Sequence, residues 1–194
     1  MKTIITTSII ITIATLTYLG FGQPANPDAA KIDREIRKAV RIPSDDIPAA
    51  ELATIKRLAL PEQELADIGG VSGLSGVEDL NLNGNQITDV GPVAKLGKLV
   101  ILDLGDNHIT DLSPLENLHD LNYLNLDKNH VESLEPLVKL QSLAGLILSG
   151  NKISDITPLL KMKSLRSLNL QGNLISKGEL NRLKKALPKC TIHI

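Results

Sequence analysis

The 194-residue sequence predicts an α/β solenoid, a right-handed superhelix in which each coil adds one short strand to a parallel β-sheet on the concave face. Three observations predict this fold. A 22-residue pattern of Leu, Asn and Pro recurs without a slipped residue, its first part alternates as a half-buried strand does, and an amphipathic helical segment stands at each end of the repeats. The returning part of each coil is too short for a long helix, so we expect 3₁₀ or extended backbone on the convex side.

The repeats are expected to occupy residues 55–175. The third coil shows the pattern in full, as Leu-x-x-Leu-x-Leu-x-x-Asn-x-Ile-x-Asp-Leu-x-Pro-Leu. The first coil keeps the apolar positions but has Gln63 where the others have asparagine, so we expect a degenerate coil adapted to a cap. The six coils are expected to begin at Ile55, Val77, Leu99, Leu121, Leu143 and Leu165.

A terminal coil cannot bury its own apolar edge, and the sequence supplies a helical cap for each end. Residues 23–54 are expected to form the N-terminal cap, because residues 28–41 place an apolar side chain at every fourth position of an amphipathic helix. Residues 176–194 are expected to form the C-terminal cap. Ser176 opens a capping box that starts a second helix, and Thr191–Ile194 has the pattern of a short final strand.

Two columns of polar residues are expected to support the turns of the coils. An amide side chain both donates and accepts hydrogen bonds, so the asparagine that follows each strand can satisfy the turning backbone. The aspartate before each return segment favours local bonds to backbone N–H groups. The structural asparagine ladder comprises Asn85, Asn107, Asn129, Asn151 and Asn173, and the aspartate column comprises Asp67, Asp89, Asp111 and Asp155.

The first 22 residues are interpreted as a signal peptide. Lys2 supplies a charged start, an apolar stretch follows, and small residues precede a cleavage site after Gly22. The alternative is an uncleaved membrane anchor formed by residues 4–21, which approach the length needed to span a bilayer. We therefore expect a secreted or periplasmic protein, or one anchored to a membrane with its repeats outside the cytoplasm.

The repeat pattern resembles the 22-residue repeats of bacterial internalins, which are leucine-rich-repeat proteins, and such repeats also occur in eukaryotic phosphatase-regulatory subunits. The resemblance covers residues 55 to about 175, and the segment 187–192 is similar to the closing segment of small bacterial proteins of this type. It implies binding of a protein or another ligand on the concave face. The sequence lacks a Leu-Pro-x-Thr-Gly sorting signal, so the resemblance is not expected to extend to host invasion.

No catalytic, cofactor or metal motif is recognised, so an enzyme is not expected. The glycine-rich segment 69–76 lacks the lysine of a phosphate loop and is interpreted as a turn. His108 and His130 lie one repeat apart and could hold a metal, but without a third ligand a solvated turn is favoured. The single cysteine, Cys190, is expected to be a buried structural thiol. The net charge of −1, with acidic and basic residues interspersed, predicts neither a nucleic-acid partner nor attraction to an anionic membrane, so membrane association is expected only if residues 4–21 are an uncleaved anchor.

The candidate binding residues stand at the third, fifth and seventh positions of the coils, which are expected to point to the concave side. Most are polar or acidic, and Tyr123 stands among aliphatic side chains near the middle, as the anchor of an interface often does. A chance scatter of apolar residues is the alternative. The candidates are Asp79, Asn81, Ile101, Asp103, Tyr123, Asn125, Asp127 and Ile147.

The function predicted is binding of a protein or other macromolecular partner by an exported, monomeric scaffold. One alternative is an intracellular regulatory subunit that docks on an enzyme such as a phosphatase. Another is a structural protein without a specific partner.

Overall fold

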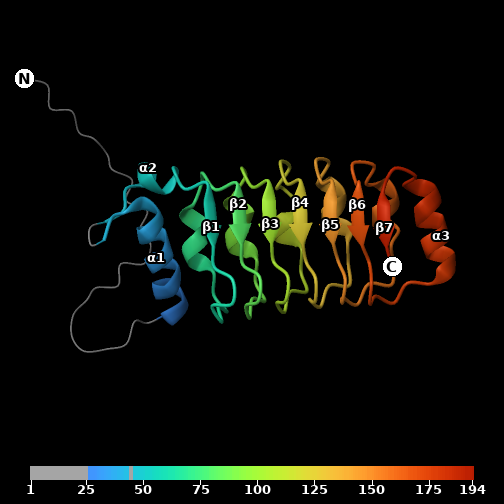
Figure 1. Cartoon of the computed structure of the whole chain (residues 1–194), viewed down its shortest axis with the longest axis horizontal. Helices are drawn as coiled ribbons and strands as arrows, with labels where there is room; N and C mark the ends of the chain where they lie inside the picture. Colours follow the sequence, from blue (N-terminus) through green and yellow to red (C-terminus); the bar gives the residue numbers. More distant parts are fainter. Residues whose placement is uncertain (1–25, 44–45) are drawn as a thin grey trace, which may run out of the picture.

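The structure, a computed structural model, describes residues 26–43 and 46–194 and confirms the predicted solenoid. Seven parallel strands form one open sheet in chain order (Figure 1), and the 3₁₀ turns lie on the opposite face of the coils. The strands are β1 (Arg57–Ala59), β2 (Asp79–Asn81), β3 (Ile101–Asp103), β4 (Tyr123–Asn125), β5 (Gly145–Ile147), β6 (Ser167–Asn169) and β7 (Thr191–His193). The 3₁₀ turns are η1 (Gly69–Gly73), η2 (Gly91–Lys95), η3 (Ser113–Leu115), η4 (Glu135–Lys139) and η5 (Pro158–Lys161).

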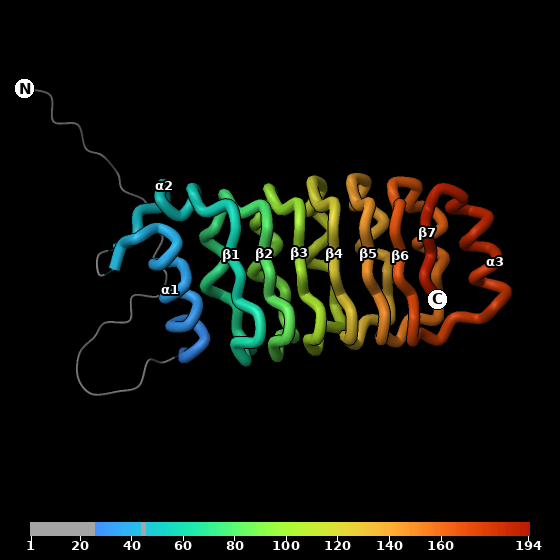
Figure 2. The backbone as a smooth tube through the Cα atoms, viewed as in Figure 1, coloured from blue at the N-terminus to red at the C-terminus, as the bar shows by residue number. Residues whose placement is uncertain are grey.

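From β1 to β6 the register of the sheet follows the 22-residue repeat without a slip. Leu80 pairs with Leu102, and Leu102 pairs with Leu124, so that equivalent residues of neighbouring coils lie directly side by side. The backbone trace in Figure 2 shows the same stacking along the length of the molecule. The central residue of each repeat strand is buried against the 3₁₀ side, and the buried hydrophobic residues of the described chain are all aliphatic, with Met162 among them.

Each ladder asparagine links its own turn to the coil before it. The Oδ1 atom of Asn107 accepts the N–H of Ile87 at 3.0 Å. Its Nδ2 atom lies 3.1 Å from the Leu82 carbonyl of the previous coil, 3.1 Å from the Leu104 carbonyl and 3.0 Å from that of Gly105. The same set of partners recurs for Asn85, Asn129, Asn151 and Asn173. The amides therefore satisfy backbone groups that the stacked coils remove from water.

The aspartate column caps the return turns. In each case Oδ1 accepts the backbone N–H two residues along, at 2.7 Å for Asp67 and Asp89 and 2.8 Å for Asp111 and Asp155. The hydroxyl and the N–H of Ser113 together hold the pKa of the Asp111 carboxyl below its usual value. These side-chain-to-backbone hydrogen bonds lie where the 3₁₀ turns begin. A proline at one of the first two positions of η2 to η5 then fixes the backbone φ angle there.

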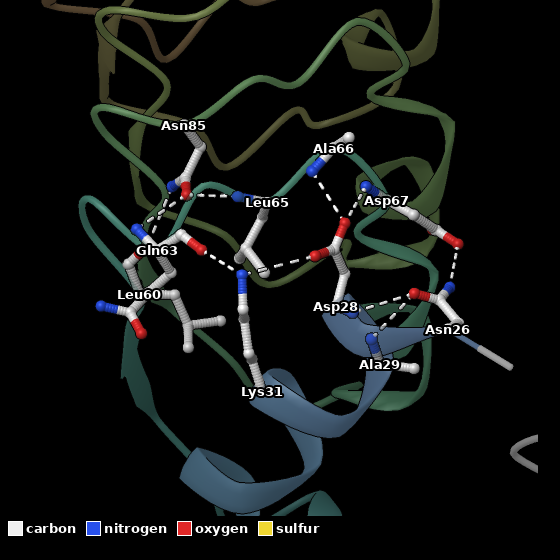
Figure 3. Close-up of polar contacts among 10 residues, drawn as sticks. All are labelled: Asn26, Asp28, Ala29, Lys31, Leu60, Gln63, Leu65, Ala66, Asp67 and Asn85. Carbon is white, nitrogen blue, oxygen red and sulfur yellow. Dashed lines mark hydrogen bonds and ion pairs between the residues drawn. The ribbon is translucent and has the colours of Figure 1, made fainter. Parts of the chain in front are cut away.

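The N-terminal cap is helix α1 (Pro27–Val40), which buries Ile32 and Ile36 against the first coil. Figure 3 shows the polar contacts that fix it there. The Asp28 carboxylate accepts the N–H groups of Ala66 and Asp67 at 2.9 and 3.0 Å. Burial of this carboxylate acts to raise its pKa, but those two donors and the Lys31 ammonium outweigh burial and hold the pKa below its usual value.

A second, four-residue helix, α2 (Ala49–Leu52), was not predicted from the sequence. The end of this helix passes directly over Gly76, where a Cβ atom would lie only 1.8 Å from the Ala53 carbonyl oxygen. Glycine is thus required at position 76, because the backbone at Ala53 leaves no space for a side chain there. The predicted turn role of the glycine-rich segment 69–76 agrees with η1, which lies within it.

The C-terminal end is closed by helix α3 (Lys177–Ala186) and strand β7. The hydroxyl of Ser176 accepts the N–H of Glu179 at 3.2 Å, which caps the helix as the sequence predicted. The predicted final strand is confirmed, since Thr191 pairs with Ser167 in parallel register.

None of the helices in residues 26–43 and 46–194 combines the length and the apolar character needed to cross a membrane. The segment interpreted as a signal peptide or anchor, residues 1–22, lies outside the described residues.

Candidate binding face

The strands place one set of side chains on the surface of the sheet, which we call the strand face. It consists of the two outer residues of each three-residue strand, which in β1 to β6 are the third and fifth residues of the coil. Strand pairing aligns them in two columns that run along the molecule. The first column is Arg57, Asp79, Ile101, Tyr123, Gly145, Ser167 and Thr191, and the second is Ala59, Asn81, Asp103, Asn125, Ile147, Asn169 and His193.

Apolar side chains lie near the middle of the strand face. Ile101 pairs directly with Tyr123 in the neighbouring strand, and Ile147 lies diagonally across from the tyrosine. Ile101 is 37% exposed, and Val100, the preceding residue, is 38% exposed. Val100 is the second residue of its coil and does not belong to the strand face. We call Ile101, Tyr123 and Ile147, the apolar residues near the middle of that face, the apolar patch.

The ring of Tyr123 lies over Gly145 in the next coil. A Cβ atom at position 145 would be 2.8 Å from the ring carbon Cδ2, so the tyrosine occupies the space that a side chain there would need. The ring is therefore only partly exposed and presents one side to solvent. Partial burial, and then the negative charge of Asp103, raise the pKa of the tyrosine hydroxyl above its usual value. The hydroxyl is neutral near pH 7 and available as a hydrogen-bond donor.

Asp103 and two asparagines form a polar cluster beside the apolar patch. The Asp103 carboxylate accepts the Asn125 side-chain amide at 2.9 Å and that of Asn83 at 3.5 Å, one from each neighbouring coil. Gly105 makes room for both amides, because a Cβ atom there would lie 2.6 Å from one and 2.8 Å from the other. The side chains of this cluster are hydrogen-bonded to one another without a partner.

The fifth-position residues have a structural role that the sequence analysis missed. Asn81, Asp103 and Asn125 each accept the backbone N–H of the residue two positions along, at 2.9 to 3.0 Å. Asn169 does the same at 3.1 Å. An Asn or Asp that ends a strand is typical of such a turn, so the signal was present in the sequence. These side chains stabilise the fold and leave only part of their polar surface for a partner.

The other predicted binding residues lie on or beside the strand face. Asp79 pairs with Arg57 of the first strand, with 3.4 Å between the guanidinium Nε and the carboxylate. Asp127, a seventh-position residue, accepts the hydroxyl of Ser149 in the next coil. The structure thus brings all eight candidates onto or beside one surface, but the five Asp and Asn residues among them already have hydrogen-bond or ion-pair partners within the chain.

The remaining candidate residues form no comparable site. His108 and His130 stack one coil apart, with parallel rings whose centroids are 5.7 Å apart, and both are exposed. In the part of the chain that the structure describes, no three His, Cys, Asp or Glu side chains are grouped so as to hold a metal ion. Cys190 is half-buried, not fully buried as expected, and it directly precedes β7, the strand at the edge of the sheet. Burial raises the pKa of its thiol.

Comparison with known proteins assigns the repeats to a family. The family model described as leucine-rich repeats in two copies matches residues 75–117, 97–139 and 141–185. The chain belongs to the leucine-rich-repeat family. A search of curated protein sequences gives no significant match.

Similar solved structures are leucine-rich-repeat proteins. An internalin (inlF) from Listeria monocytogenes is 31% identical with a TM-score of 0.65, and the match covers 87% of this chain and 55% of the internalin. A leucine-rich-repeat protein of Leptospira interrogans is also 31% identical, with a TM-score of 0.65 and coverage of 77% of this chain and 40% of that protein. Internalin C2 from Listeria monocytogenes is 26% identical with a TM-score of 0.59, covering 86% of this chain and 93% of its own. The chain therefore spans about half or less of the first two relatives, and the internalin-like character of the repeats is confirmed.

Proposed function

We propose that this protein is an exported, non-enzymatic scaffold that binds a protein partner on its strand face, with Tyr123 as the central contact. The leucine-rich-repeat fold suggests protein binding in general. The observation that supports this particular surface is the apolar patch, in which a preoriented tyrosine is flanked by aliphatic side chains and bordered by a hydrogen-bonded polar cluster. Aromatic anchors with this surrounding are typical of binding hot spots.

The dimensions of the strand face favour a small contact. Six strand spacings of about 4.8 Å and an exposed strand width of about 15 Å give a face of a few hundred Å². A standard stable interface buries about 800 Å² on each partner. A peptide segment or a small domain therefore fits the strand face alone, and a tighter complex needs further contacts along its edges.

Export is proposed from the apolar segment that follows Lys2. N-terminal sequencing of the mature protein tests this step separately from partner binding. A new terminus near Gln23 is the expected result. An intact terminus on a cytoplasmic protein would instead favour a regulatory subunit.

The binding surface can be tested by site-specific photo-crosslinking in the native host. A photoreactive phenylalanine analogue at Ile101 reports on the strand face, and the same analogue at the exposed Ala94 in η2 reports on the opposite face as a matched control. We expect one partner that is captured from position 101 and not from position 94. Capture of that partner from position 94 alone would contradict the proposed surface.

A further inference from the structure

The charges of this chain are segregated along its length, which the net charge of −1 conceals. Residues 62–160 contain fifteen Asp or Glu and five Lys, for a formal charge of −10. Residues 161–194 contain eight Lys or Arg and one Glu, for a formal charge of +7. The expectation that acidic and basic residues are interspersed is therefore wrong for the C-terminal end. We call its cations the basic end: Lys161, Lys163, Arg166, Lys177, Arg182, Lys184, Lys185 and Lys189.

The solenoid fold turns this difference in sequence into a difference in space. Because the coils stack in chain order, residues 161–194 form one end of the long axis, where α3 and β7 lie (Figure 1). All eight cations of the basic end are exposed. The acidic coils occupy the middle of the molecule, so the protein has a strong charge asymmetry along its axis.

The cations of the basic end lack the carboxylate partners that several cations elsewhere have. Lys56 lies 2.7 Å from Glu78, and Lys139 lies 2.7 Å from Glu116 in the neighbouring coil. Among the described residues of the basic end, Arg182 alone has a carboxylate within ion-pair distance, Glu179 at 3.7 Å. The other seven charges are compensated only by solvent and by backbone carbonyls.

Three of these cations line a single surface groove of about 240 Å³ between the last coil and the segment that follows α3. The Lys163 ammonium donates to the Ala186 carbonyl at 2.9 Å, and the Arg166 guanidinium donates to the Lys163 and Leu165 carbonyls at 3.0 Å. Lys189 completes the set, and no acidic side chain lines the groove. The groove is thus a local concentration of positive charge within the basic end.

Stabilisation of α3 does not account for the whole cluster. Lys184 and Lys185 lie in the last turn of the helix, where cations interact favourably with its dipole. The dipole effect falls off within one turn. Lys161 and Lys163 belong to the coil that begins at Leu143 and Arg166 to the last coil, whereas Lys177 lies at the opposite end of the helix, where a cation is unfavourable.

We infer that the basic end docks on an anionic phospholipid bilayer, with the solenoid standing away from the surface. Six of its eight cations are lysines. A lysine ammonium is a mobile point charge that suits a diffuse negative surface, whereas recognition of a single planar anion favours the two-pronged guanidinium of arginine. The acidic coils are repelled by the same surface, so the end-on orientation is favoured over one that lays the coils flat. No aromatic residue follows Tyr123, which leaves single-stranded nucleic acid without a stacking platform.

The inference is tested with the full chain and vesicles. Co-sedimentation with vesicles of equal parts phosphatidylcholine and phosphatidylglycerol should be strong at low salt, lost at high salt and absent with phosphatidylcholine alone. Each lysine near such a surface contributes about a fivefold factor in affinity. The triple variant Lys184→Glu, Lys185→Glu and Lys189→Glu should therefore weaken binding by about a hundredfold or more.

A charge-matched variant separates position from net charge. Lys95→Glu, Lys98→Glu and Lys152→Glu change the total charge by the same amount at exposed positions of the acidic coils, and binding should change only severalfold. Equal weakening by both triple variants would overturn the assignment to the basic end. Failure to co-sediment with the anionic vesicles at low salt, even if the protein binds soluble polyphosphate, would overturn the proposed docking on a bilayer. If Lys184→Glu, Lys185→Glu and Lys189→Glu together unfold α3, judged by circular dichroism, the triple variant Lys184→Gln, Lys185→Gln and Lys189→Gln applies the same test. None of these outcomes depends on the strand-face partner.

Discussion

Replacing one ladder asparagine, Asn107→Ala, should destabilise the whole solenoid strongly although the residue touches no ligand. Asn107 is only 2% exposed. Its removal leaves the Ile87 N–H without its acceptor and takes the side-chain amide donors away from the carbonyls of Leu82, Leu104 and Gly105. An orphaned buried N–H costs about 1–3 kcal/mol, and each lost hydrogen bond about 0.5–1.5 kcal/mol. The free energy of unfolding should therefore fall by about 3–5 kcal/mol.

Urea unfolding followed by far-ultraviolet circular dichroism measures this loss. Asn122→Ala is the matched control, because Asn122 is exposed and makes a single side-chain bond, to the Ser142 carbonyl at 3.0 Å. The control should lose no more than about 1 kcal/mol. A loss below about 1 kcal/mol for Asn107→Ala, or equal losses for both variants, would refute the reasoning that the ladder satisfies buried backbone groups.

Three further predictions follow from particular contacts. Gly145→Ala should push the Tyr123 ring off the strand face, because its Cβ would lie 2.8 Å from Cδ2, and should bring the raised pKa of the hydroxyl back toward its usual value in a spectrophotometric titration. An unchanged titration would show that the ring can be accommodated in place. Asp28→Asn should destabilise the protein most above about pH 4. The pKa of Asp28 is lower in the folded protein than in the unfolded chain, so the ionised carboxylate stabilises the fold at higher pH, and this stabilisation is lost as the pH falls. If thermal unfolding shows the same difference from wild type at pH 3 and pH 7, the charged form of Asp28 is not what holds α1. Gly76→Ala should displace α2 from the first coil, since its Cβ would meet the Ala53 carbonyl, and limited proteolysis between α1 and β1 should accelerate relative to Gly97→Ala, a position with open space around it.

The sequence could predict the solenoid because the repeat itself imposes the structure. Once 22 residues return the chain to the same position, the buried leucines, the asparagine ladder and the strand columns must align in register. The final strand was also predictable, since Thr191 and His193 flank an apolar residue in a strand-like alternation. Helix α2 was not predictable, because four residues are too few to show a helical period.

The candidate site was predictable in its location but not in its chemistry. Position in the repeat places Tyr123 on the strand face, whereas the direction in which its ring lies depends on the space over Gly145 in the next coil. Asn81 and Asp103 were predicted to be binding residues, but the side chains already accept the backbone N–H groups of Asn83 and Gly105. The charge segregation was present in the sequence and was hidden by summing over the whole chain.

The central claim is that a partner contacts the apolar patch, and the most direct measurement is the affinity of the purified partner for Tyr123→Ala by titration calorimetry. Ser167→Ala provides a control on the same face, at an exposed position two coils away. Truncating a central aromatic anchor costs about 2 kcal/mol or more, which is at least a roughly thirtyfold rise in Kd. We predict this rise for Tyr123→Ala with an unchanged unfolding curve and a Kd within about threefold of wild type for Ser167→Ala. An unchanged Kd for Tyr123→Ala would contradict the account.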